Sequence, residues 1–207
     1  ESTTALKESH YEMIKSLELS YENHFVLKDF CNKKDIKFLS TPYDTESARF
    51  LHEDLDVEMF KTASADLVDY PLHKYIAESR KPSIVSVGMA SLDEIEETLN
   101  IYKSYNQLDV ILLHCVSNYP CAYESLNLRV IETLRQTFDL PVGYSDHSIG
   151  VKAAVLSIGL GAKIIEKHFT IDKNLPGPDH LASSTPDEFK LLVDSVRKAE
   201  DTDEQQI

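Results

Sequence analysis

Short runs rich in β-branched and apolar residues recur along the 207-residue chain, and a segment with helical periodicity follows each of them. Consecutive runs begin 22 to 31 residues apart, which suits a strand plus a crossover helix. The six runs are IKFLSTP (36–42), EMFKTAS (58–64), PSIVSVG (82–88), DVILLHCVS (109–117), LPVGYSDH (140–147) and AKIIEKHFT (162–170). This alternation of strands and helices predicts a parallel sheet and the α/β fold class.

Helix-start signals support the helices predicted between the runs. Ser91 and Glu94 have the spacing of a capping box. Thr185, Pro186 and Glu188 supply a cap, a first-turn proline and a third-position glutamate for the last predicted helix. The stretch SIGVKAAVLSIGLGA is almost wholly apolar, so we expect a helix packed between the sheet and its neighbours.

Polar residues stand at the carboxyl end of every predicted strand, after an apolar stem. A doubly wound open sheet would bind its ligand at one switch point, usually marked by a glycine-rich turn. The chain has only six glycines and contains neither the dinucleotide nor the phosphate-loop motif. A (β/α)8 TIM barrel gathers functional groups from many strand ends at once. The pattern therefore favours this barrel, with about six of its eight βα units present in the chain.

Composition narrows the possible partners. The chain is 42% hydrophobic and 27% charged, as is typical of globular proteins, and no stretch is as long and apolar as a membrane span. A net charge of −14 argues against nucleic acid, although a locally positive site would still accept a small anion. Three cysteines without C-x-x-C spacing indicate a reducing compartment, and we expect a cytoplasmic location.

Two histidines end consecutive predicted strands: His147 closes GYSDH and His168 closes IIEKH. A single histidine would be interpreted as a core residue that hydrogen-bonds to the backbone. Neighbouring parallel strands lie about 4.8 Å apart, however, so the two imidazoles could converge on one divalent ion. With only two such ligands, the ion would keep open positions for substrate and water.

A lysine and several hydroxyls form the second candidate group. Lys61 is flanked by Phe60 and Thr62, and we expect it to point into the barrel as a charge for phosphate or carboxylate, although a surface lysine is the ordinary alternative. Hydroxyl donors stand near the ends of successive strands and would complete an oxyanion site: Thr41, Ser64, Ser86, Ser117 and Ser145. Asp179 follows a proline–glycine turn, and a turn former is as good an interpretation as a functional group.

The motifs FKTASADLVDYPL, LLHCVSNYP, GYSDHSIG, IIEKHFT and GPDHLASSTPDEF, in this order, resemble the sialic acid synthase (N-acetylneuraminate synthase) family along essentially the whole chain. The resemblance implies a TIM barrel followed by a small antifreeze-like domain, and a cytoplasmic homodimer. It implies a transferase that condenses phosphoenolpyruvate with N-acetylmannosamine to give N-acetylneuraminate and phosphate, with Mn²⁺ or Mg²⁺.

The resemblance also implies roles for individual residues. His147 and His168 match the metal-binding histidines and, with Asp66, are the expected catalytic residues. Phosphoenolpyruvate would be held by Lys61, Thr41, Ser64, Ser86, Ser117 and Ser145. Tyr119, Asp179 and Asp66 match positions that hold the amino sugar.

Residues 1–207 are expected to form a partial barrel, without the family's first strands and without the antifreeze-like domain. We therefore expect the 207-residue chain by itself to be inactive. Two alternatives remain open: the same reaction on a related amino sugar to give legionaminic acid, and a non-catalytic barrel fragment that binds a metal or a sugar phosphate. A metal-dependent hydrolase is disfavoured because the chain has no H-x-H pair.

Overall fold

A computed structural model describes residues 10–177 and 179–203 and shows a parallel five-stranded sheet. The strands follow one another across the sheet in chain order: β1 (Phe60–Thr62), β2 (Ser83–Ser86), β3 (Val110–Cys115), β4 (Val142–Asp146) and β5 (Ile165–Lys167). Each lies inside one of the predicted runs, so five of the six predicted strands and the parallel α/β class are confirmed.

The sixth predicted strand, residues 36–42, is wrong. This segment precedes β1, but within the described chain it forms no strand ladder. Ile36 is 62% exposed and Leu39 is 37% exposed, whereas Phe38 packs against the core, so the apolar residues of this run are only partly buried. An apolar run becomes a strand only where its backbone pairs with a neighbour, and the sequence pattern does not report that pairing.

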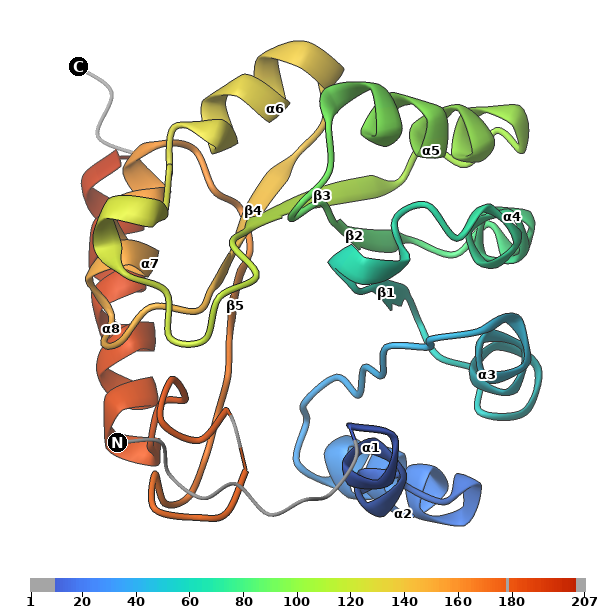
Figure 1. The fold of residues 1–207 in the computed structure, drawn as a ribbon, viewed down its shortest axis with the longest axis horizontal. Helices are drawn as coiled ribbons and strands as arrows, with labels where there is room; N and C mark the ends of the chain where they lie inside the picture. The colour runs from blue at the N-terminus through green and yellow to red at the C-terminus, as the bar shows by residue number, and fades with distance from the viewer. Residues whose placement is uncertain (1–9, 178, 204–207) are drawn as a thin grey trace.

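Helices flank the curved sheet on its outer side and continue beyond its β1 edge, as Figure 1 shows. They are α1 (His10–Leu17), α2 (Tyr21–Lys33), α3 (Thr45–Arg49), α4 (Tyr70–Ser79), α5 (Leu92–Ser104), α6 (Val130–Phe138), α7 (Lys152–Gly159) and α8 (Pro186–Asp203). A helix thus lies between each pair of consecutive strands, which is the connection that parallel pairing requires. Among the described residues, no helix has both the length and the apolar character needed to cross a membrane.

Both predicted helix starts are confirmed. The Ser91 side chain accepts a hydrogen bond from the Glu94 backbone, and the Glu94 carboxylate accepts one from the Ser91 backbone. At the start of α8, the Thr185 backbone donates to Glu188 Oε2 at 2.9 Å, with Pro186 as the first helical residue. In α7 the inner face is buried, although Leu156 is 63% exposed, so the expected burial of this helix is only partial.

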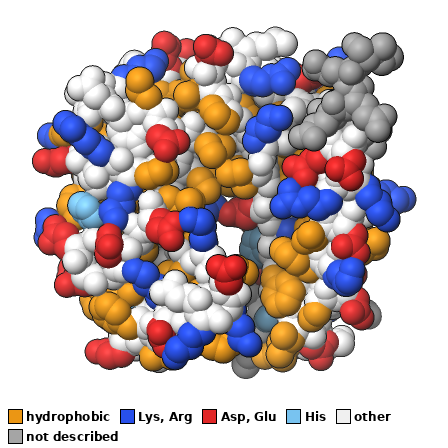
Figure 2. Space-filling view, turned by 180° about the vertical axis from the view of Figure 1, so that it is seen from behind, with side chains coloured by type: hydrophobic (Ala, Val, Ile, Leu, Met, Phe, Trp, Pro, Cys, Tyr) orange, Lys and Arg blue, Asp and Glu red, His pale blue; other side chains and the backbone are white. Residues whose placement is uncertain are grey.

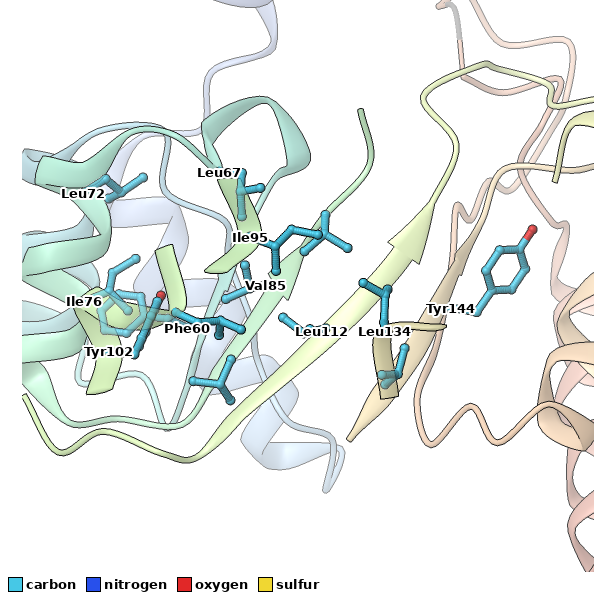
Figure 3. Close-up of a cluster of buried hydrophobic side chains, with 14 of the residues drawn as sticks. Phe60, Leu67, Leu72, Ile76, Val85, Ile95, Tyr102, Leu112, Leu134 and Tyr144 are labelled. Carbon is cyan, nitrogen blue, oxygen red and sulfur yellow. The ribbon is translucent and has the colours of Figure 1, made fainter. Parts of the chain in front are cut away.

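The core fills the space between the sheet and α4, α5 and α6 (Figure 3). Phe60, Val85 and Leu112 project from three successive strands toward this helix layer. Their side chains are at most 1% exposed, and they meet Ile76 of α4 and Ile95 of α5. Because side chains alternate along a strand, this packing leaves the intervening residues facing the concave side of the sheet. On the face seen in Figure 2, acidic and basic side chains are interspersed around a central hollow.

Candidate active site

A cavity of about 440 Å³ opens at the carboxyl ends of the five strands. Parallel strands bring all their carboxyl ends to one edge, so polar residues distant in sequence meet there. Nine of the eleven residues predicted from the sequence line this cavity: Lys61, Ser64, Ser86, Ser117, Tyr119, Ser145, His147, His168 and Asp179.

An ion pair crosses this cavity. Lys61 Nζ lies 3.2 Å from Glu166 Oε2, and the lysine side chain is only 14% exposed. Ser145 Oγ donates a 2.7 Å hydrogen bond to the other oxygen of Glu166. Lys61 therefore points into the cavity, as predicted. Its charge and the serine hydroxyls line the same cavity, where they could bind an anionic ligand.

Close backbone packing shapes one wall of the cavity. The Gly88 backbone donates to Ser64 Oγ at 2.9 Å, and the same oxygen lies 2.9 Å from Cys115 Sγ. A Cβ atom on Gly88 would approach Cys115 Sγ to 2.7 Å, so only glycine fits here. The Ser86 hydroxyl is buried and has no hydrogen-bond partner among the described residues. A buried hydroxyl without a partner is costly unless a ligand or water satisfies it.

The two strand-end histidines come together as predicted: the ring centroids of His147 and His168 are 5.4 Å apart at an interplanar angle of 82°. His147 Nδ1–H donates to the Val116 carbonyl at 2.7 Å, which leaves the Nε2 lone pair available, 3.3 Å from Ser145 Oγ. Burial, and then the neighbouring His168, lower the pKa of His147, so its neutral ligating form is favoured. The Tyr119 ring lies 4.1 Å from that of His147.

These donors suit a metal ion with several open positions. A backbone acceptor for the second ring nitrogen, as at His147, is typical of metal-binding histidines. His168 Nδ1 also lies 3.8 Å from Asp179 Oδ2, which places a carboxylate beside the pair. Across the described residues, no group of three or more His, Cys, Asp or Glu side chains is arranged to hold a metal. Within the described residues, the two imidazoles are thus the donors that would bind the ion, and substrate or water would fill further positions.

Two predicted residues do not line this cavity. Thr41 lines an adjoining cavity of about 520 Å³ beside α2, and Tyr43 borders both cavities. Asp66 ends the short 3₁₀ turn Ser64–Asp66, and its Oδ2 is buried without a hydrogen-bond partner among the described residues. Burial, and then the nearby Asp69, raise the pKa of the Asp66 carboxyl.

Sequence reasoning missed Glu166, the only carboxylate paired with Lys61 among the described residues, as well as Tyr43, Met89 and Cys115 on the cavity wall. Glu166 lies two residues before His168, so the two-residue alternation of a strand puts it on the same face. Counting back from His168 would have found it. Cys115 occupies the inward position at the end of β3 in the same way.

Known proteins share this sequence and fold. The chain is 46% identical to the N,N'-diacetyllegionaminic acid synthase of Legionella pneumophila, over 93% of this chain and 55% of the relative. It is 43% identical to the enzyme of that name from Campylobacter jejuni, over 95% of this chain and 59% of the relative. It thus spans little more than half the length of these curated relatives.

A solved structure is also similar. The crystal structure of N-acetylneuraminic acid (sialic acid) synthetase from Leptospira borgpetersenii serovar Hardjo-bovis matches with a TM-score of 0.90 and 37% identity. The match covers 94% of this chain and 67% of the solved one. A model of the NeuB family matches residues 1–207. The resemblance found in the motifs is confirmed: the chain belongs to the NeuB family.

Proposed function

We propose that this chain carries the active site of a synthase that condenses phosphoenolpyruvate with the open-chain aldehyde of an N-acetylated amino sugar, releasing phosphate. The observation that carries the proposal is the division of the cavity into two chemically different ends. Lys61 and the hydroxyls form an end suited to an anion, and His147 with His168 forms an end suited to a metal ion.

At the anion end, Lys61 would bind phosphate or carboxylate oxygens of phosphoenolpyruvate. Ser64 and Ser86 project from the β1 and β2 side, and Ser145 from β4, so hydroxyl donors surround the ammonium group. Glu166 holds Lys61 inside the cavity rather than letting it extend into solvent. This arrangement would stabilise negative charge as phosphate leaves.

At the other end, His147 and His168 would hold Mn²⁺ or Mg²⁺, which supplies Lewis-acid polarisation of the sugar aldehyde when bound. Tyr119 and Asp179 line the wall beside these imidazoles, and we assign them to the amino sugar. Thr41 would join from the adjoining cavity, and Asp66 would join from the short turn Ser64–Asp66, whose Ser64 lines the main cavity.

The reaction makes one carbon–carbon bond, and at C2 a carbon–oxygen bond to water replaces the carbon–oxygen bond to phosphate. C3 of phosphoenolpyruvate attacks the aldehyde carbon, whose oxygen takes up a proton. Water adds at C2, the bond from C2 to the phosphate oxygen breaks, and the product carries a 2-keto acid. The chain's residues would align the two substrates and exclude competing water, which is the main contribution of a positioned site.

The first candidate product is N-acetylneuraminate, formed from N-acetylmannosamine. The second is N,N'-diacetyllegionaminic acid, and a specific observation favours it: the two synthases of that name are 46% and 43% identical to this chain, whereas the solved sialic acid synthetase is 37% identical. A few residues of the pocket wall set the choice between these two sugars.

The wider setting is part of the same proposal. We infer that the five strands belong to a (β/α)8 TIM barrel, and that the complete protein has a further antifreeze-like domain and forms a homodimer. Cys31, Cys115 and Cys121 are all free thiols, which supports a cytoplasmic location.

The proposal is tested by following phosphate release from phosphoenolpyruvate with the protein in its natural full length. Reactions contain Mn²⁺ and either N-acetylmannosamine or the 2,4-diacetamido sugar that would give N,N'-diacetyllegionaminic acid. Release that depends on both substrates supports the synthase, and the better sugar identifies the product. Binding of phosphoenolpyruvate without turnover on either sugar would instead support a non-catalytic binding protein, and turnover without phosphoenolpyruvate would support a hydrolase.

A further inference from the structure

A buried ion pair lies directly behind the two cavity histidines. Lys167 Nζ is 3.0 Å from Asp146 Oδ2, and the two side chains are 1% and 0% exposed. Asp146 ends β4 and Lys167 ends β5, and the two residues are register partners in the sheet. Each immediately precedes a histidine, His147 or His168, so the ion pair faces away from the cavity while the imidazoles face into it.

The pair is tied to the turn that follows His147. Asp146 Oδ1 accepts hydrogen bonds from the Ser148 backbone at 2.8 Å, from Ser148 Oγ at 2.7 Å and from the Tyr144 hydroxyl at 3.2 Å. Lys167 Nζ also donates to the Ser148 carbonyl. On the other side of this turn, the Cys121 backbone donates to the His147 carbonyl at 2.9 Å. The backbone around His147 is thus held on both sides.

Stability alone does not explain this arrangement. Removing two charges from water is expensive, and a well-packed apolar pair in the same volume is often as stable or more stable. An apolar pair, however, would pack equally well in several relative positions, whereas hydrogen-bonded charges require one geometry. The Lys167 ammonium contacts both Asp146 and the Ser148 carbonyl. These two contacts fix the position of β5 along the strand direction relative to β4.

Register matters here more than elsewhere in the sheet. A shift of one residue along a strand moves every side chain to the opposite face. The described part of β5 is only three residues long, Ile165–Lys167, so few ladder hydrogen bonds oppose such a shift. The ion pair supplies the constraint at the one position where a shift would separate His147 from His168.

We propose that Asp146 and Lys167 are a positioning pair: they lock β4 and β5 in the register that brings the imidazoles of His147 and His168 within reach of one ion. The inference rests on the proposed function only for the identity of that ion. The positioning itself is a property of the two strands.

The test compares Mn²⁺ affinity, measured by isothermal titration calorimetry, in the natural full-length protein and in the double variant D146N/K167M. Both substitutions keep the approximate size of the side chain, and asparagine retains an acceptor for Ser148. We expect Mn²⁺ affinity to fall about 10–100-fold, the effect typical of groups that orient metal ligands. Phosphoenolpyruvate affinity, measured in the same way, should fall by a smaller factor. Lys61, Ser64 and Ser86 stay in place, whereas Glu166 and Ser145 belong to the two strands that the pair aligns.

The matched control is Tyr102→Phe, which removes the buried 3.0 Å hydrogen bond between Tyr102 and His73 in the helix layer. This variant should melt at a lower temperature and keep the Mn²⁺ affinity of the natural protein. A double variant that melts earlier but also keeps its Mn²⁺ affinity would show that the ion pair is merely structural and would overturn the proposal.

Two further measurements cover the remaining outcomes. If D146N/K167M does not fold, Ser148→Ala removes only the 2.7 Å hydrogen bond to Asp146 and should weaken Mn²⁺ binding to an intermediate degree. If the natural protein binds no Mn²⁺, the proposed metal site fails, and a crystal structure of the variant decides the positioning. A ring separation that stays at 5.4 Å would then overturn the inference, and an increased separation would support it.

Discussion

The Lys61 ammonium of β1 and the Glu166 carboxylate of β5 lie 3.2 Å apart, although β1 and β5 are the two opposite edges of the five-stranded sheet. In a flat sheet these edges would be about 19 Å apart, four strand spacings of about 4.8 Å. The sheet must therefore curl until its edges face each other across the cavity. This curvature supports the proposed barrel and brings the anion-binding and histidine groups into one site.

Replacement of Lys61 tests the anion end. Lys61→Met should raise the KM for phosphoenolpyruvate by roughly 10–100-fold, because charge-assisted hydrogen bonds contribute about 1.5–3 kcal/mol. The KM for the amino sugar should change much less. Steady-state kinetics of phosphate release with each substrate varied in turn provide the measurement.

Lys81→Met is the matched control, since Lys81 is 20% exposed and forms a 2.6 Å ion pair with Asp56 outside the cavity. This variant should leave both KM values unchanged. Equal kinetics for Lys61→Met and Lys81→Met would show that the Lys61 charge does not meet the substrate.

The metal end is tested by His147→Asn and His168→Asn. Each variant should lose more Mn²⁺ affinity than the 10–100-fold typical of an outer-shell change, because a direct ligand is removed. Calorimetric titration of Mn²⁺ measures the effect. His52→Asn removes a half-buried histidine that hydrogen-bonds to Tyr75 outside the cavity, and it should bind Mn²⁺ as the natural protein does. Unchanged affinity in both cavity variants would exclude the proposed ligands.

Close packing at Gly88 predicts a coupled loss of stability and binding. In Gly88→Ala the new methyl group would displace Cys115 and, with it, Ser64 on the cavity wall. Overpacking of this kind costs about 1–3 kcal/mol in the free energy of unfolding, and phosphoenolpyruvate binding should weaken in the same variant. Urea unfolding and calorimetry measure the two effects.

Gly159 in α7 is the matched control, because a Cβ atom there meets nothing within 4 Å. Gly159→Ala should raise the free energy of unfolding by up to about 1 kcal/mol through helix propensity and leave binding intact. If Gly88→Ala proved equally harmless, the close approach of Gly88 and Cys115 would not shape the site.

His73 predicts a loss of stability in weak acid. The ring is fully buried between α4 and α5, donates through Nε2 to the Asp66 carbonyl and accepts at Nδ1 from the Tyr102 hydroxyl. Burial lowers the pKa of His73 from 6.5 to about 4. Between these two values the unfolded chain binds a proton that the folded protein does not, so the free energy of unfolding falls as the pH drops through this window.

Because of His73, the free energy of unfolding should be about 2 kcal/mol lower at pH 5 than at pH 7. Urea unfolding of the natural protein and of His73→Gln at both pH values measures this difference. Glutamine does not titrate, so the variant lacks the contribution of His73 to the pH dependence. The natural protein should lose about 2 kcal/mol more than the variant. The same pH dependence in both proteins would contradict a neutral, buried His73.

The sequence pattern alone predicted those features that depend on residues close together along the chain. The alternation of apolar runs and helical segments determined the parallel α/β class and five strands, and the capping residues Ser91 and Thr185 determined where two helices begin. Strand-end polarity also predicted six of the residues that line the cavity, because parallel strands always bring their carboxyl ends to one edge. They are Ser64, Ser86, Ser117, Ser145, His147 and His168.

Only the tertiary structure decided features that depend on pairing and curvature. Residues 36–42 have the composition of a strand but form no strand ladder with any described residue, and Thr41 lines the adjoining cavity. Glu166 reaches Lys61 because the sheet curls, and Lys167 reaches Asp146 because β4 and β5 have one particular register. A sequence specifies which residue types occupy a face. Which of them meet is set by the distances between strands, and these emerge only when the whole sheet packs against its helices.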